Sequence, residues 1–266
     1  MRAEIEIDHK KYIVDFSKGR DISIPLHFNS LQPNTYGVDI ATSKPYQDGK
    51  FIGDTRQGGP CNFETYRFTP HCNGTHTECI GHITEERIDI LSSLKEEMIA
   101  CTVISITPKK TTESYIPNLQ SQDLVITKQA LELELKNADP LFLNGLVIRT
   151  LPNDNSKKKR NYMKVPPPFF SIEAIEYVVS LGVQHLLVDS PSLDRLFDDG
   201  QLTAHNMFWE TKQKIFNTKT QHKTITEMIF VPKEVKDGCY LLNLQVPAFV
   251  SDAAPSRPIL YQINGL

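Results

Sequence analysis

Runs of apolar residues separated by polar turns divide the chain into predicted strands and helices. Residues 99–106 and 183–188 are continuous apolar runs rich in β-branched side chains, which predicts strands buried on both faces. Residues 141–150 have the same character. The remaining strands are predicted over residues 21–26, 63–68, 225–232, 238–244 and 259–263, with 225–232 and 238–244 paired to each other.

Helical spacing of apolar side chains marks three stretches between these strands. Residues 121–136 and 202–214 each predict a helix. Residues 172–181 are the clearest case, because Ser171 suits the N-cap and Gly182 suits the position just after the helix. No internal repeat or change of composition marks a linker, so residues 1–266 predict one mixed α/β domain.

Two polar stretches interrupt this pattern. Residues 29–62 are rich in Asn, Gln, Gly, Pro and Thr, which predicts a long loop, and such loops are often functional. Its aromatic side chains, with Phe63 just beyond it, either form the walls of a pocket or pack on their own domain; they are Tyr36, Tyr46, Phe51 and Phe63. Residues 157–160 read Lys-Lys-Lys-Arg, for which we expect a solvated loop rather than a binding patch.

Composition limits the partners and the compartment. Lys and Arg number 29 against 32 Asp and Glu, so we expect no general electrostatic affinity for nucleic acid or an anionic membrane. We also expect no membrane span and no signal peptide, and hence a cytoplasmic protein. The five cysteines are odd in number and form no Cys-x-x-Cys pair, which favours free thiols over a disulfide scaffold.

The densest group of reactive side chains lies in residues 70–82, which hold three of the eight histidines, two cysteines and one glutamate. Cys72, His76, Glu78 and His82 occupy even positions, so they would share one face of an extended segment. The Cα atoms of His76 and Glu78 would then lie about 6.6 Å apart, and the two side chains could bind one ion. Cys72 needs a bend to join them, and the intervening Asn-Gly dipeptide supplies one.

Three interpretations of this group remain open. Imidazole, carboxylate and thiolate are normal zinc ligands, and His82 could carry protons beside such an ion. A structural interpretation instead places the histidines and the glutamate on a solvent-facing strand and the cysteines in the core. A third interpretation makes Cys72 or Cys79 the nucleophile of a cysteine hydrolase, with His76 as its base.

The segment Gly74-Thr75-His76, with His82 six residues further on, resembles a known signature. It is similar to the His-x-Gly-Thr-His-x-Asp-x-Pro-x-His motif of cyclase-like metal-dependent hydrolases, a family that includes bacterial kynurenine formamidase and isatin hydrolase. The other motifs of the family have counterparts in the same order, at residues 21–26, 146–150, 189–194, 204–205 with 226–227, and 252–260. The resemblance implies an α/β fold of the swivelling β/β/α type, with a mixed, partly barrel-like sheet and packed helices. It also implies a homodimer or homotetramer.

Carried over position by position, the resemblance implies a metal centre. Cys72, His76 and Glu78 would bind one ion, and Glu78, His205 and Glu227 would bind a second, with Glu78 shared. The chain departs from the motif at two ligands, because Cys72 replaces a histidine and Glu78 an aspartate. A thiolate ligand would favour zinc over manganese. Whether the centre holds one ion or two stays open.

The implied activity is that of a metal-dependent amidohydrolase resembling kynurenine formamidase. It would cleave a C–N bond in an amide, formamide or lactam, in a small and aromatic substrate, with His82 as the catalytic proton donor and acceptor. One alternative is ring opening of a cyclic amide such as isatin. The other is a non-catalytic binding or structural descendant of the same fold, which the altered residues Cys72 and Glu78 favour.

Overall fold

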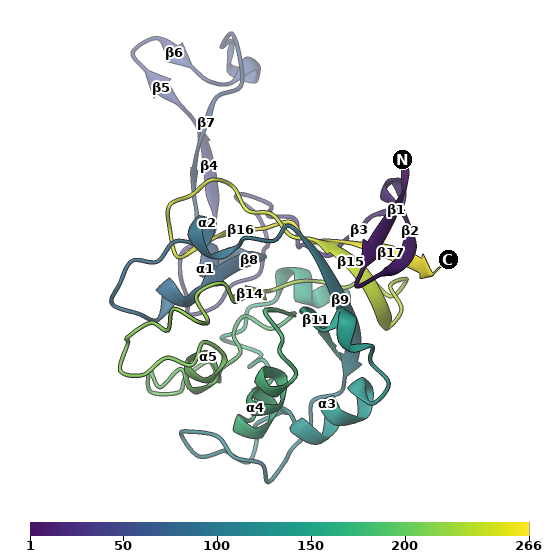
Figure 1. Ribbon diagram of the computed structural model, residues 1–266. Helices are drawn as coiled ribbons and strands as arrows, with labels where there is room; N and C mark the ends of the chain where they lie inside the picture. Colours follow the sequence, from purple (N-terminus) through teal and green to yellow (C-terminus); the bar gives the residue numbers. More distant parts are fainter. Residues whose placement is uncertain (266) are drawn as a thin grey trace.

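The computed structural model describes residues 1–265, and a large mixed β-sheet forms its centre (Figure 1). The middle of the sheet is four parallel strands, in the order β9 (Met98–Ile106), β11 (Gly145–Thr150), β13 (His185–Val188) and β14 (Thr224–Glu227). Nearly all their residues are buried, as the apolar runs predicted.

Antiparallel strands extend the sheet on both sides. β8 (His76–Cys79) pairs with β14, and β16 (Ala253–Pro255) forms the edge beyond it. Beyond β9 the order is β15 (Gly238–Asn243), β17 (Ile259–Gly265), β2 (Lys10–Asp15) and β1 (Arg2–Ile7), with β3 (Arg20–Asp21) also on β17. The predicted pairing of 225–232 with 238–244 is therefore wrong. β14 is an interior strand between β13 and β8, so its backbone partners are already taken.

Several short elements connect the strands of the sheet. They are α1 (Pro70–Asn73), α2 (Ile90–Ser93), β10 (Val125–Ile126), β12 (Phe169–Phe170), and the 3-10 turns η1 (Phe16–Lys18), η2 (Thr55–Gln57), η3 (Ile80–His82), η4 (Pro140–Phe142) and η5 (Asn155–Lys159).

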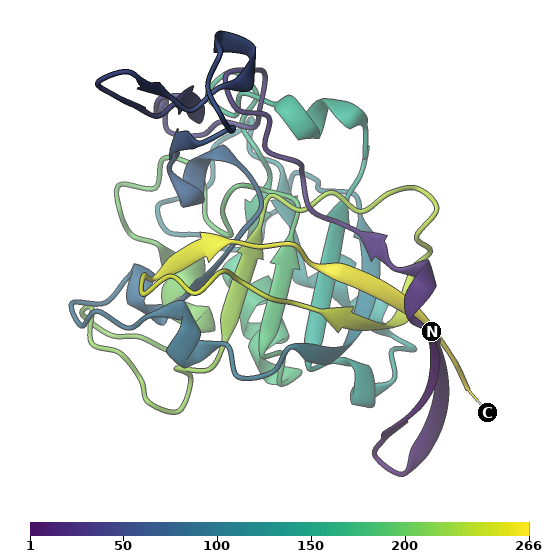
Figure 2. The same ribbon diagram turned by 90° about the horizontal axis from the view of Figure 1, so that it is seen from above.

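Two cores lie on opposite faces of the sheet. Leu146 and Ile148 of β11 face the helices α3 (Lys128–Leu135), α4 (Ile172–Ser180) and α5 (Thr203–Phe208). Val147 points the other way, as alternation along a strand requires. There it packs in one cluster with Leu242 of β15 and Leu260 of β17, which run across the central strands in Figure 2. The predicted mixed, partly barrel-like α/β architecture is confirmed.

The helix predictions succeed where the caps are strong. The Ser171 side chain accepts a hydrogen bond from the Ala174 N–H, and Gly182 has φ +78°, so α4 begins and ends as predicted. The helix predicted over residues 202–214 stops at Phe208, since Glu210 adopts a left-handed conformation at φ +52°. No helix within residues 1–265 is long and apolar enough to cross a membrane.

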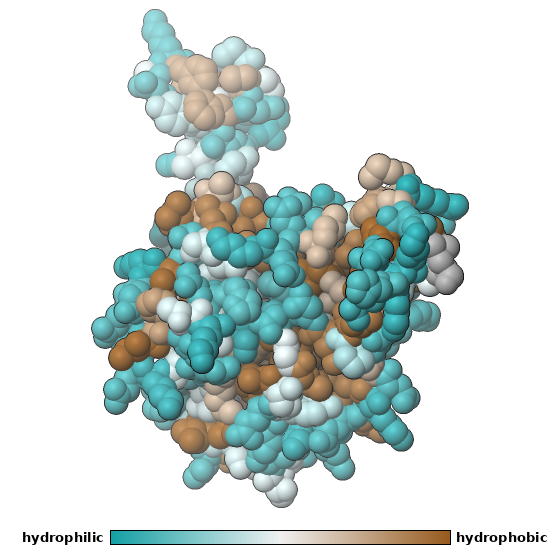
Figure 3. Space-filling model, in the orientation of Figure 1, coloured by the Kyte–Doolittle hydropathy of each residue, from teal (hydrophilic) through white to brown (hydrophobic). Residues whose placement is uncertain are grey.

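Residues 29–62 are not a plain loop. They contain β4 (Thr42–Pro45), β5 (Gln47–Asp48) and β6 (Phe51–Ile52), and β4 pairs with β7 (Glu64–Arg67). Together these strands form an arm that stands out from the body in Figures 1 and 3. Of the two alternatives for the loop aromatics, packing within their own domain holds for three rings, which contact one another in this arm with centroids 5.0 to 6.3 Å apart; they are Tyr46, Phe51 and Phe63.

The basic stretch 157–160 is only partly a solvated loop. Lys157 is 3% exposed, and its ammonium group lies 2.7 Å from Asp189 Oδ2. It also donates to the backbone carbonyl and the hydroxyl of Thr150. The first lysine of the run is therefore an interior residue, while Lys158 and Lys159 remain exposed.

Candidate metal centre

Strand β8 supplies the middle of the centre. His76 and Glu78 are two residues apart in this buried strand, so both side chains point to the same face. His76 Nε2 lies 4.0 Å from Glu78 Oε2. Glu227 is directly opposite His76 in the pairing of β14 with β8, and its Oε2 lies 3.4 Å from His76 Nε2. Sheet register thus brings together residues far apart in the sequence.

Helix α5 supplies His205 from the neighbouring layer. Its Nε2 lies 3.1 Å from Glu78 Oε1 and 3.5 Å from Glu227 Oε1. The other ring nitrogen, Nδ1, lies 2.6 Å from Asp194 Oδ2, and the His205 backbone N–H also donates to that carboxylate. Asp194 accepts a further hydrogen bond from the Tyr115 hydroxyl, so the imidazole is held in one orientation.

The atoms that meet here are suited to a cation. His76 Nε2, Glu78 Oε2 and Glu227 Oε1 are buried without a hydrogen-bond partner among the described residues. Buried polar atoms are normally paired, because leaving them unpaired costs free energy. One ring nitrogen and two carboxylate oxygens without hydrogen bonds, all in one cluster, are the atoms that would bind a divalent ion. Two groups of potential ligands share Glu78, namely His71 with His76 and Glu78, and Glu78 with His205 and Glu227.

The structure brings His71, rather than Cys72, to this cluster. Residues 70–73 form the single helical turn α1, with Pro70 at its first position, so the side chains follow helical and not extended geometry. His71 Nδ1 lies 2.9 Å from Glu78 Oε2. Cys72 is buried and belongs to none of the potential ligand groups within residues 1–265. Burial and the nearby Glu227 charge raise the pKa of its thiol to about 11.

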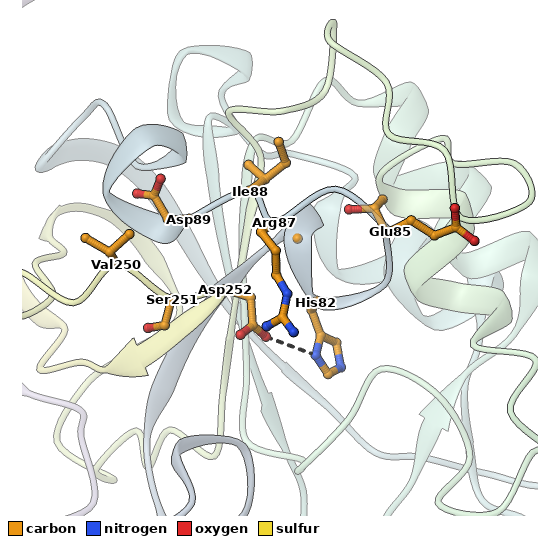
Figure 4. A pocket seen from close by; sticks show the side chains of 10 residues that line it. His82, Glu85, Arg87, Ile88, Asp89, Val250, Ser251 and Asp252 are labelled. Carbon is orange, nitrogen blue, oxygen red and sulfur yellow. Dashed lines mark ion pairs between the residues drawn. The ribbon is translucent and has the colours of Figure 1, made fainter.

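His82 stands at the outer side of the cluster. It ends the 3-10 turn η3, is 29% exposed, and its Nε2 lies 3.8 Å from Glu78 Oε2. Its ring stacks on that of His71 with the centroids 4.2 Å apart. It also lines a cavity of about 460 Å³, together with Arg87 and Asp252 (Figure 4). Groups in this cavity have direct access to the His82 imidazole.

Asp252, which the residue-by-residue argument from the sequence did not select, joins both outer histidines. Its Oδ2 lies 2.9 Å from His71 Nε2 and 3.4 Å from His82 Nδ1. The only sequence signal for it is its place at the start of the motif-like segment 252–260. Burial and the charge of Glu227 raise the pKa of the Tyr36 hydroxyl to about 12.

Neighbouring charged groups in the centre shift one another's pKa values. Burial disfavours the ionised form of Glu78, but His82, His205 and His71 together hold the pKa of its carboxyl well below its usual range. Burial lowers the pKa of His71, yet Asp252 and Glu78 raise it to about 10. The Glu78 carboxyl is therefore ionised, and the protonated imidazoles beside it supply positive charge. A divalent cation would supply that charge and displace protons from the histidines.

Comparison with known families identifies the class of protein. The family model named Cyclase, described as "Putative cyclase", matches residues 20–195. The chain belongs to this family. A search of curated proteins found no match.

Solved structures agree with this assignment at the level of fold. A predicted metal-dependent hydrolase from Bacillus stearothermophilus is 17% identical, with a TM-score of 0.60 over 92% of this chain and 98% of that one. Isatin hydrolase A from Labrenzia aggregata is 11% identical, with a TM-score of 0.60 over 92% and 93%. An isatin hydrolase bound to thioisatinate is 13% identical, with a TM-score of 0.55 over 93% of each chain. At these identities the likeness shows a shared fold.

Proposed function

We propose that this chain is a metal-dependent hydrolase that cleaves the C–N bond of an amide, formamide or lactam. The observation that carries the proposal is the convergence of buried, unpartnered donor atoms from His76, Glu78 and Glu227 on one point. The similar structures include proteins described as metal-dependent hydrolases, which supports the proposal without defining the substrate.

The residues that would hold the ion are His71, His76, Glu78, His205 and Glu227. When bound, a divalent ion polarises a carbonyl and lowers the pKa of a water molecule. His71 here takes the place that the sequence motif suggested for Cys72. These ligands are all nitrogen and oxygen atoms. The preference for zinc that a thiolate ligand would give therefore does not apply, and zinc and manganese both suit the centre.

His82 has the geometry for the proton transfers. It lies beside the cluster and faces the cavity, so it can accept the proton that water loses as it adds to the carbonyl carbon. It then donates that proton to the leaving nitrogen as the C–N bond breaks.

A cysteine nucleophile has less support. Burial raises the pKa of the thiols of both Cys72 and Cys79 to about 11, so both are protonated near neutral pH. A protonated thiol is a poor nucleophile. The non-catalytic alternative loses part of its basis as well, because His71 supplies an imidazole where the sequence motif offered only Cys72.

A side-by-side assay tests this function. Zinc- and manganese-loaded protein is assayed with N-formylkynurenine and with isatin, before and after removal of the metal by a chelator. We expect hydrolysis of at least one substrate, its loss with the chelator, and recovery when the metal is restored. The His82→Ala variant should lower kcat by about 10²- to 10⁴-fold. His222→Ala, an exposed histidine outside the centre, is the control and should leave kcat unchanged.

Two outcomes would contradict the proposal. Hydrolysis that survives complete removal of the metal would exclude a metal-dependent mechanism. Full metal content without turnover of either substrate would favour the non-catalytic alternative.

A further inference from the structure

We propose that Asp252 is a positioning residue that orients two histidines at once, the ligand candidate His71 and the proton carrier His82. The inference rests on the proposed function and adds a role for Asp252, which is not among the ligands proposed above although its carboxylate forms a third group of potential ligands with His71 and His82. It is carried by where the Asp252 backbone is fixed and by what its carboxylate touches.

The backbone of Asp252 is tied to the strand that carries the centre. Its carbonyl accepts a hydrogen bond from the Cys79 N–H at 3.0 Å. The next residue, Ala253, begins β16 and pairs in register with Glu78. The carboxylate of Asp252 is therefore held at a set distance from the metal-facing side chains of β8, although 173 positions separate Cys79 from Asp252 in the sequence (252 minus 79).

The two rings present opposite nitrogens to two carboxylates. His71 directs Nε2 to Asp252 and Nδ1 to Glu78, both at 2.9 Å. His82 directs Nδ1 to Asp252 at 3.4 Å, while its Nε2 faces Glu78 at 3.8 Å. The rings stack with an interplanar angle of 29°, so a single carboxylate oxygen can reach both.

This arrangement fixes which nitrogen is free. A ring nitrogen that donates to Asp252 carries the proton, and the other nitrogen then offers its lone pair toward Glu78 and the cluster. Once an ion displaces the second proton of His71, that lone pair is on Nδ1, the atom that lies 2.9 Å from Glu78 Oε2. For His82 it is on Nε2, which can accept a proton from water near the same point. Asp252 thereby couples metal binding to proton transfer.

The cavity places a second constraint on the role of Asp252. Figure 4 shows its carboxylate at the cavity wall beside His82, with the contact between them drawn as a dashed line. A residue at this wall that bound substrate directly would act on KM. A residue that only orients the two imidazoles would act on metal affinity and on kcat.

The test is a zinc titration by competition with a chelating dye, on wild type, Asp252→Asn and Asp252→Glu. Asparagine keeps the shape but loses the negative charge and has an NH₂ donor in place of one of the two acceptor oxygens, so Asp252→Asn should weaken zinc binding by about 10- to 100-fold at unchanged stoichiometry. With the substrate found in the assay above, kcat should fall while KM is unchanged. Asp252→Glu should recover part of both. Asp21→Asn is the matched control, since Asp21 is 39% exposed against 36% for Asp252 and pairs with Arg257 rather than with a histidine of the centre.

The outcomes separate this inference from the proposed function. Unchanged zinc affinity in Asp252→Asn, with an active metal-bound wild type, overturns the positioning role alone. A lower zinc stoichiometry overturns it in favour of a direct ligand, and a higher KM with unchanged kcat overturns it in favour of a substrate contact. Weaker zinc binding in Asp252→Asn, with a wild type that binds zinc but hydrolyses nothing, supports the positioning role and overturns the function. A wild type that binds no metal overturns both.

Discussion

Two buried polar clusters lie along the same sheet and differ in how completely their atoms are paired. In the first, the Lys157 ammonium contacts Asp189 and donates to both oxygens of Thr150, and Asp189 in turn accepts from the Thr150 N–H and hydroxyl. In the second, around Glu78, three potential metal-ligand atoms make no hydrogen bond, although oppositely charged groups lie 2.9 to 4.0 Å from them. Both clusters are buried and charged, so burial does not explain the difference.

This is the difference we expect between a structural network and a binding site. A fully paired cluster such as that of Lys157 needs nothing more and holds the loop after β11 to the end of β13. A cluster left unpaired on one side is stabilised when a ligand completes it. The following predictions run from the largest expected effect to the smallest, and all but the one on His185 test one side of this comparison.

Removal of Lys157 should give the largest loss of stability. Lys157→Met leaves the Asp189 carboxylate buried without its partner, and breaking a buried ion pair in this way costs about 3–5 kcal/mol. Chemical denaturation measures the free energy of unfolding. The neighbouring exposed Lys159→Met is the control and should change it little. Equal stability of the two variants would show that the paired cluster has no structural role.

A second buried contact, His185 with Thr224, should make the protein less stable in mild acid. Burial and the nearby His222 lower the pKa of His185 from 6.5 to about 4. The unfolded chain then binds the proton more readily, so the contribution is fully present above pH 6.5 and is lost as the pH falls toward 4. The full loss is about 3 kcal/mol.

The difference between wild type and His185→Gln isolates this group. Denaturation curves at several pH values should converge between pH 6.5 and 4, because only wild type pays the cost of charging the buried imidazole. Stability curves that stay parallel over this range would contradict the prediction.

Metal binding should stabilise the protein through the cluster around Glu78. The size of this stabilisation should not depend on the cluster around Lys157. At a free metal concentration about 100-fold above Kd, binding to the folded state adds about 2.7 kcal/mol to the free energy of unfolding. Glu78→Gln should lose this increment, since Glu78 belongs to both shared ligand groups, whereas Lys157→Met should keep it. An increment of the same size in Glu78→Gln would place the metal elsewhere.

Cys72→Ala should have the smallest effect. The lost sulfur leaves a small cavity that costs about 1 kcal/mol, and metal affinity should be unchanged because the thiol is outside the ligand groups. His71→Ala, one residue away, should weaken metal binding strongly. The reverse result, with Cys72 required and His71 dispensable, would restore the ligand set that the sequence motif implied.

Much of the fold follows from local patterns. The apolar runs gave the central strands, and the caps at Ser171 and Gly182 gave α4. β7 lies within the predicted strand 63–68, but β4 to β6 of the arm were missed, because strands of two to four residues are too short for alternation to be detected. The false pairing of 225–232 with 238–244 arose because adjacency in sequence is a poor guide when β14 is an interior parallel strand.

The candidate site was predictable only within one strand. Alternation placed His76 and Glu78 on one face, as β8 shows. The same rule selected Cys72 over His71, because it assumed an extended chain where Pro70 begins a helical turn. Contacts from β14, α5 and the turn before β16 depend on tertiary packing. The family resemblance implied the roles of His205 and Glu227. The contacts of Asp252 with the histidines became apparent only in the structure.

The central claim is that the unpaired cluster around Glu78 binds a divalent metal. The most direct measurement is the metal content of wild type and His76→Ala by plasma mass spectrometry, after stripping, reloading with zinc and desalting. The account predicts about one or two equivalents of zinc in wild type, as the two ligand groups that share Glu78 allow, and a clear loss in His76→Ala. Wild type with no more zinc than His76→Ala would contradict it.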